Sequence, residues 1–90
     1  SSESSIIAST AALRVASIQL QLGQHDKALS TLTVDAEDGF SGLIYNLKGD
    51  VYLDLGNSDE AKKYYGLAIE NITENSSLTQ LIQIKLDDLN

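Results

Sequence analysis

One stretch of this 90-residue chain occurs twice, 33 residues apart. Residues 20–28, LQLGQHDKA, align with residues 53–61, LDLGNSDEA. The identical pairs are Leu20 and Leu53, Leu22 and Leu55, Gly23 and Gly56, Asp26 and Asp59, and Ala28 and Ala61. A repeat at a spacing of about 20–50 residues marks a small structural unit that cannot bury its apolar side alone. The chain is therefore expected to fold as stacked copies of one unit.

The repeated residues describe the end of one helix and the beginning of the next. Gly23 and Gly56 each follow a Leu-x-Leu sequence, where glycine supplies the left-handed residue that ends a helix. Asp26 and Asp59 come three residues later, and a carboxylate there is expected to cap the N–H groups that open the next helix. Proline is absent and glycine occurs only six times, which favours uninterrupted helices. The unit is therefore a helix, a tight turn and a second helix.

Hydrophobic periodicity predicts five helices. The expected helices are residues 5–22, 26–34, 40–55, 59–73 and 77–89. The third carries two apolar stripes, so it should be covered on two sides. One stripe consists of Phe40, Leu43, Ile44, Leu47, Val51 and Leu55, and the second of Tyr45, Gly49 and Tyr52. The predicted fold class is all-α. It consists of two helical-hairpin repeat units, about 5–37 and 38–73, and a C-terminal capping helix at 77–89, as one domain and a fragment of a right-handed α-solenoid.

The first and last helices are expected to differ in what covers them. The last helix has a single apolar stripe, which consists of Leu78, Leu81, Ile82, Leu86 and Leu89, and this is typical of a cap. The first helix is apolar round most of its circumference, and such a helix expects neighbours on both sides. Two alternatives are open: further repeats pack there in a longer protein, or a second copy of the chain does. We expect the isolated chain to self-associate through Ile6, Ile7, Leu13 and Ile18.

Composition excludes several classes of function. Thirteen acidic and six basic residues give a net charge of −7, the opposite of what nucleic acid or anionic lipid attracts. Cysteine is absent, which excludes disulfides, thiolate zinc sites and a cysteine nucleophile. The only histidine, His25, is expected to pack in a turn or lie exposed, because a catalytic histidine needs an oriented partner. The acidic segment 35–39 departs from the calcium-loop pattern, so we predict no metal, no cofactor and no catalytic residue.

The second unit resembles the tetratricopeptide repeat. That pattern is Trp-x2-Leu-Gly-x2-Tyr, then Ala-x3-Phe, within about 34 residues. The residues that fit the pattern are Tyr45, Gly49, Tyr52, Ala61, Tyr65 and Ala68. Lys48 stands where the pattern has leucine and departs from it. The resemblance implies that two helices approach closely at Gly49 and Ala61. It also implies that Tyr52 and Tyr65 fill the space beside them.

Three segments, residues 12–21, 46–50 and 83–89, carry a narrower resemblance to the YfgM-type family. The resemblance implies a C-terminal fragment of a single-pass protein of the bacterial inner membrane, with the repeats on the periplasmic side and the anchor outside this chain. It further implies a non-catalytic ancillary subunit of the SecYEG translocon, whose partners are translocon subunits, periplasmic chaperones or exported polypeptides. The alternative is a repeat adaptor of another bacterial assembly, such as outer-membrane biogenesis or secretion.

The resemblance also implies where partners bind, because repeat arrays of this kind use the concave face lined by the first helix of each unit. The matching residues are Leu13, Ser17, Leu20 and Gln21 in the first unit and Leu43, Asn46, Asp50, Leu53 and Asp54 in the second. Packing between units is an alternative role for several of the leucines. Asp50 and Asp54 lie one turn apart with few bases nearby, so we expect their charge to select basic partners. The same acids argue against the carboxylate clamp found in one subclass of these repeats.

Overall fold

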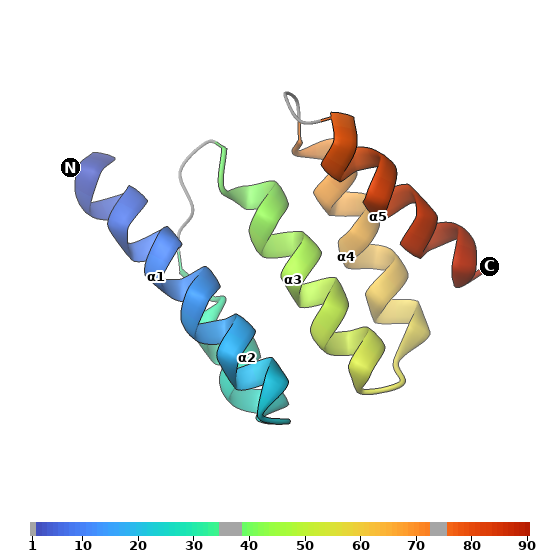
Figure 1. The fold of residues 1–90 in the computed structure, drawn as a ribbon, viewed down its shortest axis with the longest axis horizontal. Coiled ribbons are helices and arrows are strands. Elements are labelled where there is room, and N and C mark those ends of the chain that lie inside the picture. The colour runs from blue at the N-terminus through green and yellow to red at the C-terminus, as the bar shows by residue number, and fades with distance from the viewer. Residues whose placement is uncertain (1, 35–38, 73–75) are drawn as a thin grey trace.

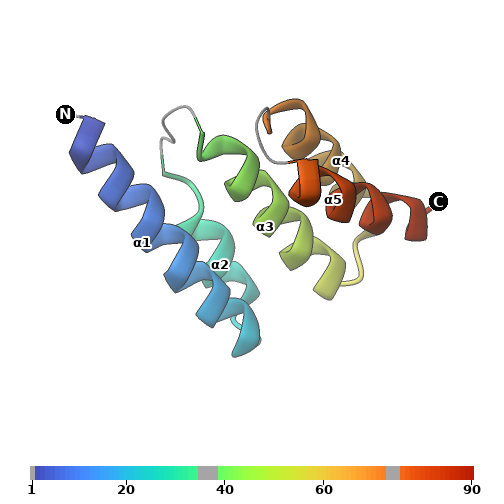
Figure 2. The ribbon, with the colours of Figure 1, turned by 45° about the horizontal axis from the view of Figure 1, so that its top comes forward.

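The computed structural model describes residues 2–34, 39–72 and 76–90. The described residues form five helices, which are α1 (Ser2–Gln21), α2 (His25–Thr31), α3 (Ser41–Asp54), α4 (Ser58–Glu70) and α5 (Ser76–Asp88). They follow one another across a thin slab of 40 × 30 × 17 Å, with α1 and α5 at its two ends (Figure 1). A second view shows α2 lying behind α1 and α4 behind α5 (Figure 2). The fold is the all-α arrangement of helical hairpins that the repeat predicts.

The turns after α1 and α3 have the same structure, as the repeated Leu-x-Leu-Gly sequence predicts. Gly23 and Gly56 have φ angles of +74° and +81°, in the left-handed region. In each turn the glycine N–H donates to the carbonyl three residues earlier, and the next residue donates to the carbonyl five residues earlier, with N···O distances of 2.8–3.0 Å. This is the Schellman arrangement, which satisfies the free carbonyls at a helix end. Each hairpin turn is therefore fixed by a few neighbouring residues.

The expected capping role of Asp26 and Asp59 is wrong. Helices α2 and α4 each begin one residue before the aspartate. The N-cap residues are Gln24 and Asn57, which directly follow the two glycines. Asn57 caps α4 by accepting a hydrogen bond from the backbone N–H of Glu60 at 3.3 Å, whereas Gln24 makes no such bond for α2. The aspartates lie in the first turn, where the helix dipole favours negative charge.

Two helices end earlier than their apolar periodicity predicts. Helix α2 ends at Thr31 rather than at 34, and α4 ends at Glu70 rather than at 73. After α2 the chain continues in turns, and the side chain of Leu32 is still buried at 1% exposure. The apolar pattern therefore continues past the helix itself. Of the acidic segment 35–39, only Gly39 is among the described residues, so the calcium-loop argument lies outside them.

Two clusters of buried side chains lie on opposite sides of α3. The first joins α1 and α2 to α3 and consists of Ala16, Ala28, Leu32, Ile44 and Val51. The second joins α4 to α5 and consists of Ala61, Tyr65, Ala68 and Ile82, with Tyr45 and Tyr52 of α3 packed against it. The prediction that the third helix is covered on two sides is confirmed.

Helices α3 and α4 approach each other closely at Gly49. The ring of Tyr65 lies directly over this glycine, and a Cβ atom placed there would be 2.5 Å from the Cε1 atom of the ring. The Tyr65 side chain is fully buried, as is Ala61. Tyr52 is half-buried and stacks on Tyr64, with ring centroids 5.5 Å apart. The tight contact expected at Gly49 and Ala61 is present, and a tyrosine ring fills it.

The capping helix departs from the prediction at one residue. Ile82 is fully buried, and Leu78, Leu86 and Leu89 pack around it. Leu81, however, is 49% exposed, and the neighbouring Ile84 is 58% exposed. Leu81 lies about 100° round the helix from Ile82, beyond the surface that α4 covers. Helix α5 therefore keeps an apolar strip in solvent.

Replacing Gly49 with leucine should lower the free energy of unfolding by about 1–3 kcal/mol, because the Tyr65 ring leaves no room for a side chain. Thermal unfolding followed by circular dichroism measures the change. Gly66→Ala is the matched control, because a Cβ atom at Gly66 in α4 meets nothing within 4 Å. Alanine there should stabilise the helix by about 0.5–1 kcal/mol. Equal melting temperatures for Gly49→Leu and the unsubstituted chain would contradict the tight contact.

Candidate functional site

The residues predicted to bind partners occupy equivalent positions on α1 and α3. A shift of 33 residues superimposes Leu13 on Asn46, Ser17 on Asp50, Leu20 on Leu53 and Gln21 on Asp54. At about 100° per residue, these positions and Leu43 span about a third of each helix circumference. We call this surface, made by all nine predicted residues, the α1–α3 face. It runs across both hairpins.

Only part of the α1–α3 face is open to solvent. Leu13 and Leu20 are half-buried and pack against the first core cluster. This is the packing role that was the alternative to partner binding for these leucines. Leu43, Asn46 and Asp50 are also half-buried. Leu53 is 41% exposed. The exposed members of the face are Ser17, Gln21, Leu53 and Asp54.

Asp50 belongs to a hydrogen-bonded group that joins three helices. Its carboxylate accepts a bond from the Tyr65 hydroxyl of α4 at 2.5 Å and another from Lys85 Nζ of α5 at 3.0 Å. The same ammonium donates to Oδ1 of Asn46 at 3.1 Å and lies 5.4 Å from the centroid of the Tyr65 ring. The expectation that Asp50 lies apart from basic residues is therefore wrong. A lysine 35 residues away supplies the countercharge.

Burial keeps the Tyr65 hydroxyl protonated. Removal of the Tyr65 side chain from water raises its pKa far above the usual range, and the hydrogen bond and charge of Asp50 raise the pKa further. The phenol therefore keeps its proton and remains a donor to Asp50 at any physiological pH. Asp50, Tyr65 and Lys85 hold α3, α4 and α5 together beneath the open part of the face.

The raised pKa of Tyr65 predicts a loss of stability in alkali. Above about pH 10 the unfolded tyrosine releases its proton while the folded one keeps it, so unfolding becomes more favourable. Tyr65→Phe should cost about 1 kcal/mol at neutral pH, through the lost hydrogen bond. Above pH 10 the free energy of unfolding of the unsubstituted chain should fall relative to that of Tyr65→Phe by up to about 1.4 kcal/mol per pH unit, so the difference should close and then reverse. Urea unfolding at several pH values measures this, and parallel curves would contradict it.

Asp54, at the other end of the face, also has a partner. Its Oδ2 atom lies 2.6 Å from Nε2 of His25, the first residue of α2. The side chain of His25 is 23% exposed and that of Asp54 is 59% exposed. The expectation that His25 packs in a turn or lies exposed did not include this contact. The contact joins the turn of the first hairpin to the end of α3. Asp54 still presents a carboxylate to solvent.

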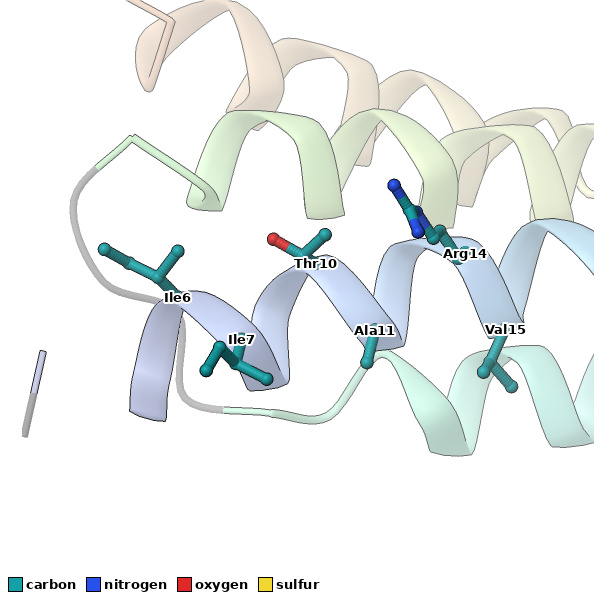
Figure 3. A pocket seen from close by; sticks show the side chains of 6 residues that line it. All are labelled: Ile6, Ile7, Thr10, Ala11, Arg14 and Val15. Atoms are coloured by element: carbon teal, nitrogen blue, oxygen red, sulfur yellow. The ribbon is translucent and has the colours of Figure 1, made fainter. Parts of the chain in front are cut away.

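A separate surface of α1 is apolar and open. Ile6, Ile7, Val15, Ile18 and Leu22 are 45–69% exposed. A shallow hollow of about 440 Å³ lies along this helix, and Figure 3 shows Ile7, Ala11 and Val15 projecting from one side of it and Thr10 and Arg14 from another. Leu13, which we expected to contribute to self-association, instead packs inward. Ile6, Ile7 and Ile18 are exposed among the described residues, as expected for a first helix with one uncovered side.

The described part of the chain holds no group of three or more histidine, aspartate or glutamate side chains placed to bind a metal ion. None of the helices in that part has the length and apolarity needed to cross a membrane. The α1–α3 face presents hydroxyl, amide, carboxylate and leucine groups to solvent.

The chain is similar to known proteins over nearly its whole length. A family model described as a tetratricopeptide repeat-like domain matches residues 1–90. A Neisseria gonorrhoeae protein named ancillary SecYEG translocon subunit is 40% identical over 85 residues, which are 94% of this chain and 41% of that protein. A protein of the same name from Aggregatibacter actinomycetemcomitans is 41% identical over 88 residues, which are 98% of this chain and 42% of that protein.

The similarity extends to a more distant protein. The Escherichia coli protein of that name is 29% identical over 77 residues, which are 86% of this chain and 37% of that protein. No solved structure matches the chain. The chain spans about two fifths of the length of the curated relatives it matches.

Proposed function

Since the chain belongs to the tetratricopeptide repeat-like domain family, we propose that it is a non-catalytic scaffold that binds other proteins as part of an ancillary subunit of the SecYEG translocon. The observation that carries this proposal is the 40–41% identity, over nearly the whole chain, to two proteins of that name. In this proposal the repeats lie on the periplasmic side of the inner membrane. There they connect translocon subunits with periplasmic chaperones or exported polypeptides.

Partners bind, in this proposal, on the α1–α3 face. Its open residues come from both hairpins, so one extended partner would contact the two units together. Leu53 supplies an apolar anchor, and the neighbouring Asp54 supplies the exposed negative charge. Asp50 and Asn46 support the face from below, because Lys85 already binds both of them.

Site-specific crosslinking in native membranes tests the proposal. A photoreactive amino acid at Leu53 of the full-length protein should crosslink to a translocon subunit or to a periplasmic chaperone. The control position is Lys63, which is exposed on α4 and lies outside the α1–α3 face. Crosslinks to those proteins from Lys63 alone would place binding elsewhere. Their absence from both positions, with intact translocon in the same membranes, would argue against the proposed function.

Apolar and charged contacts on the face should respond differently to salt. Leu53→Ala should weaken binding of the crosslinked partner by at least about 1 kcal/mol at both low and high ionic strength. Asp54→Asn should slow association at low salt and have little effect at high salt, because exposed charges mainly set association rate and are screened. Surface plasmon resonance at two ionic strengths separates the effects. Asp50→Asn is unsuitable here, because Asp50 holds Tyr65 and Lys85.

We also propose that the isolated 90-residue chain self-associates through the open side of α1, where Ile6, Ile7 and Ile18 are 45–69% exposed. Sedimentation at micromolar concentration should show a species larger than the monomer. Ile18→Glu should dissociate it. Ile84→Glu is the matched control, since Ile18 is 57% exposed and Ile84 is 58% exposed. Equal effects of the two substitutions, or a monomer without either, would contradict the role of α1.

A further inference from the structure

The hairpin formed by α3 and α4 carries a second surface, on which lysines lie beside stacked tyrosine rings. Tyr45 and Tyr52 of α3 both stack on Tyr64 of α4, with ring centroids 6.1 and 5.5 Å apart. The Nζ atom of Lys48 lies 5.5 Å from the centroid of the Tyr64 ring, and that of Lys63 lies 5.2 Å from it. We call these five residues the tyrosine–lysine surface.

The tyrosine–lysine surface is separate from the α1–α3 face. Lys48 lies about 140° round α3 from Leu53 and about 160° from Asp50. Lys63 is exposed on α4, a helix that contributes nothing to the α1–α3 face. A partner bound to one surface does not need the other, so crosslinks from Lys63 and from Leu53 report on different surfaces.

The first hairpin closes without such a group. At the 33-residue shift, Gln19 and Thr31 stand where the second hairpin has Tyr52 and Tyr64. The Thr31 hydroxyl donates a hydrogen bond to Oε1 of Gln19 at 2.7 Å, which joins the two helices there. The other three residues of the surface replace smaller, uncharged ones of the first hairpin, which are Ala12, Val15 and Ser30. A hairpin of this chain therefore does not need these rings and charges in order to close.

Neither ammonium group of this surface has an acidic partner among the described residues. A lysine ammonium has three N–H donors, and a ring attracts its charge without taking up those donors as oxygen atoms do. Lys85 differs, because its ammonium lies over the Tyr65 ring and also donates to Asp50. The chain has 13 acidic and six basic residues, yet two of its lysines share one ring and keep their donors available.

We propose that the tyrosine–lysine surface binds an acidic segment of a partner protein, whose carboxylates accept hydrogen bonds from Lys48 and Lys63. Charge complementarity selects this occupant, because both ammonium groups lie within 5.5 Å of one ring centroid. The three half-buried rings form the floor beneath the segment. Nucleic acid is a poorer occupant, because the net charge is −7 and the rings stack on one another rather than on bases.

Binding of fluorescently labelled hexaglutamate to the purified full-length protein, followed by fluorescence anisotropy, tests the proposal. Hexaglutamine with the same label is the uncharged control peptide and should not bind. Lys48→Gln and Lys63→Gln should each weaken hexaglutamate binding about three- to fivefold at low ionic strength, toward the upper end of the range for exposed ion pairs. Lys27→Gln is the matched control, because Lys27 is exposed on α2 and its loss changes the net charge equally. It should leave binding unchanged.

Equal effects of the three substitutions would overturn the proposal, because binding would then follow net charge rather than this surface. Absence of hexaglutamate binding at millimolar peptide would also overturn it. Equally tight binding of hexathymidylate would do the same, because the surface would then accept any polyanion. Circular dichroism checks the fold of each variant, and the exposed position of Lys63 keeps the test valid if Lys48→Gln disturbs the hairpin. The measurement needs no translocon, so its outcome is independent of the proposed function.

Discussion

Helix α3 has to bury two opposite sides at once, and the rest of the fold follows from how it does so. On one side Ile44 and Val51 pack in a cluster with Ala16, Ala28 and Leu32 of the first hairpin. On the other, Gly49 lets the Tyr65 ring lie against the helix backbone. A larger residue at Gly49 would move α4 outward, and α5, which packs on α4, would move with it. The positions of α4 and α5 thus depend on the absence of a side chain at Gly49.

The same contact determines the chemistry of the α1–α3 face. With its ring over Gly49, Tyr65 places its hydroxyl on Asp50, and Lys85 completes the group from α5. Asp50 is held by its hydrogen bonds to Tyr65 and Lys85. Asp54, one turn later, stays largely in solvent beside His25. The face is consequently less acidic than the net charge of the chain suggests. Its open part centres on Leu53 and the polar residues of α1.

Local sequence predicts the parts of this structure that depend on local interactions. The glycine turns follow from residues within a few positions of Gly23 and Gly56, and the two stripes of α3 follow from periodicity. Contacts between distant residues were not predictable in this way. The pairing of Lys85 with Asp50 and that of His25 with Asp54 cross 35 and 29 residues, and each depends on how two hairpins stack. The exposure of Leu81 also depends on helix packing, because α4 covers only part of the surface of α5.

The thinness of the molecule has a consequence for how it unfolds. A slab 17 Å thick is less than two helix diameters deep, so each helix is held by its neighbours along the row rather than by a central core. In such linear arrays stability is close to a sum of unit and nearest-neighbour contributions, and units at the ends can open separately. Helices α3 and α4 share the most extensive contact. Amide hydrogens of this pair should therefore exchange last, while α1 and α5 open earlier by fraying from the two ends.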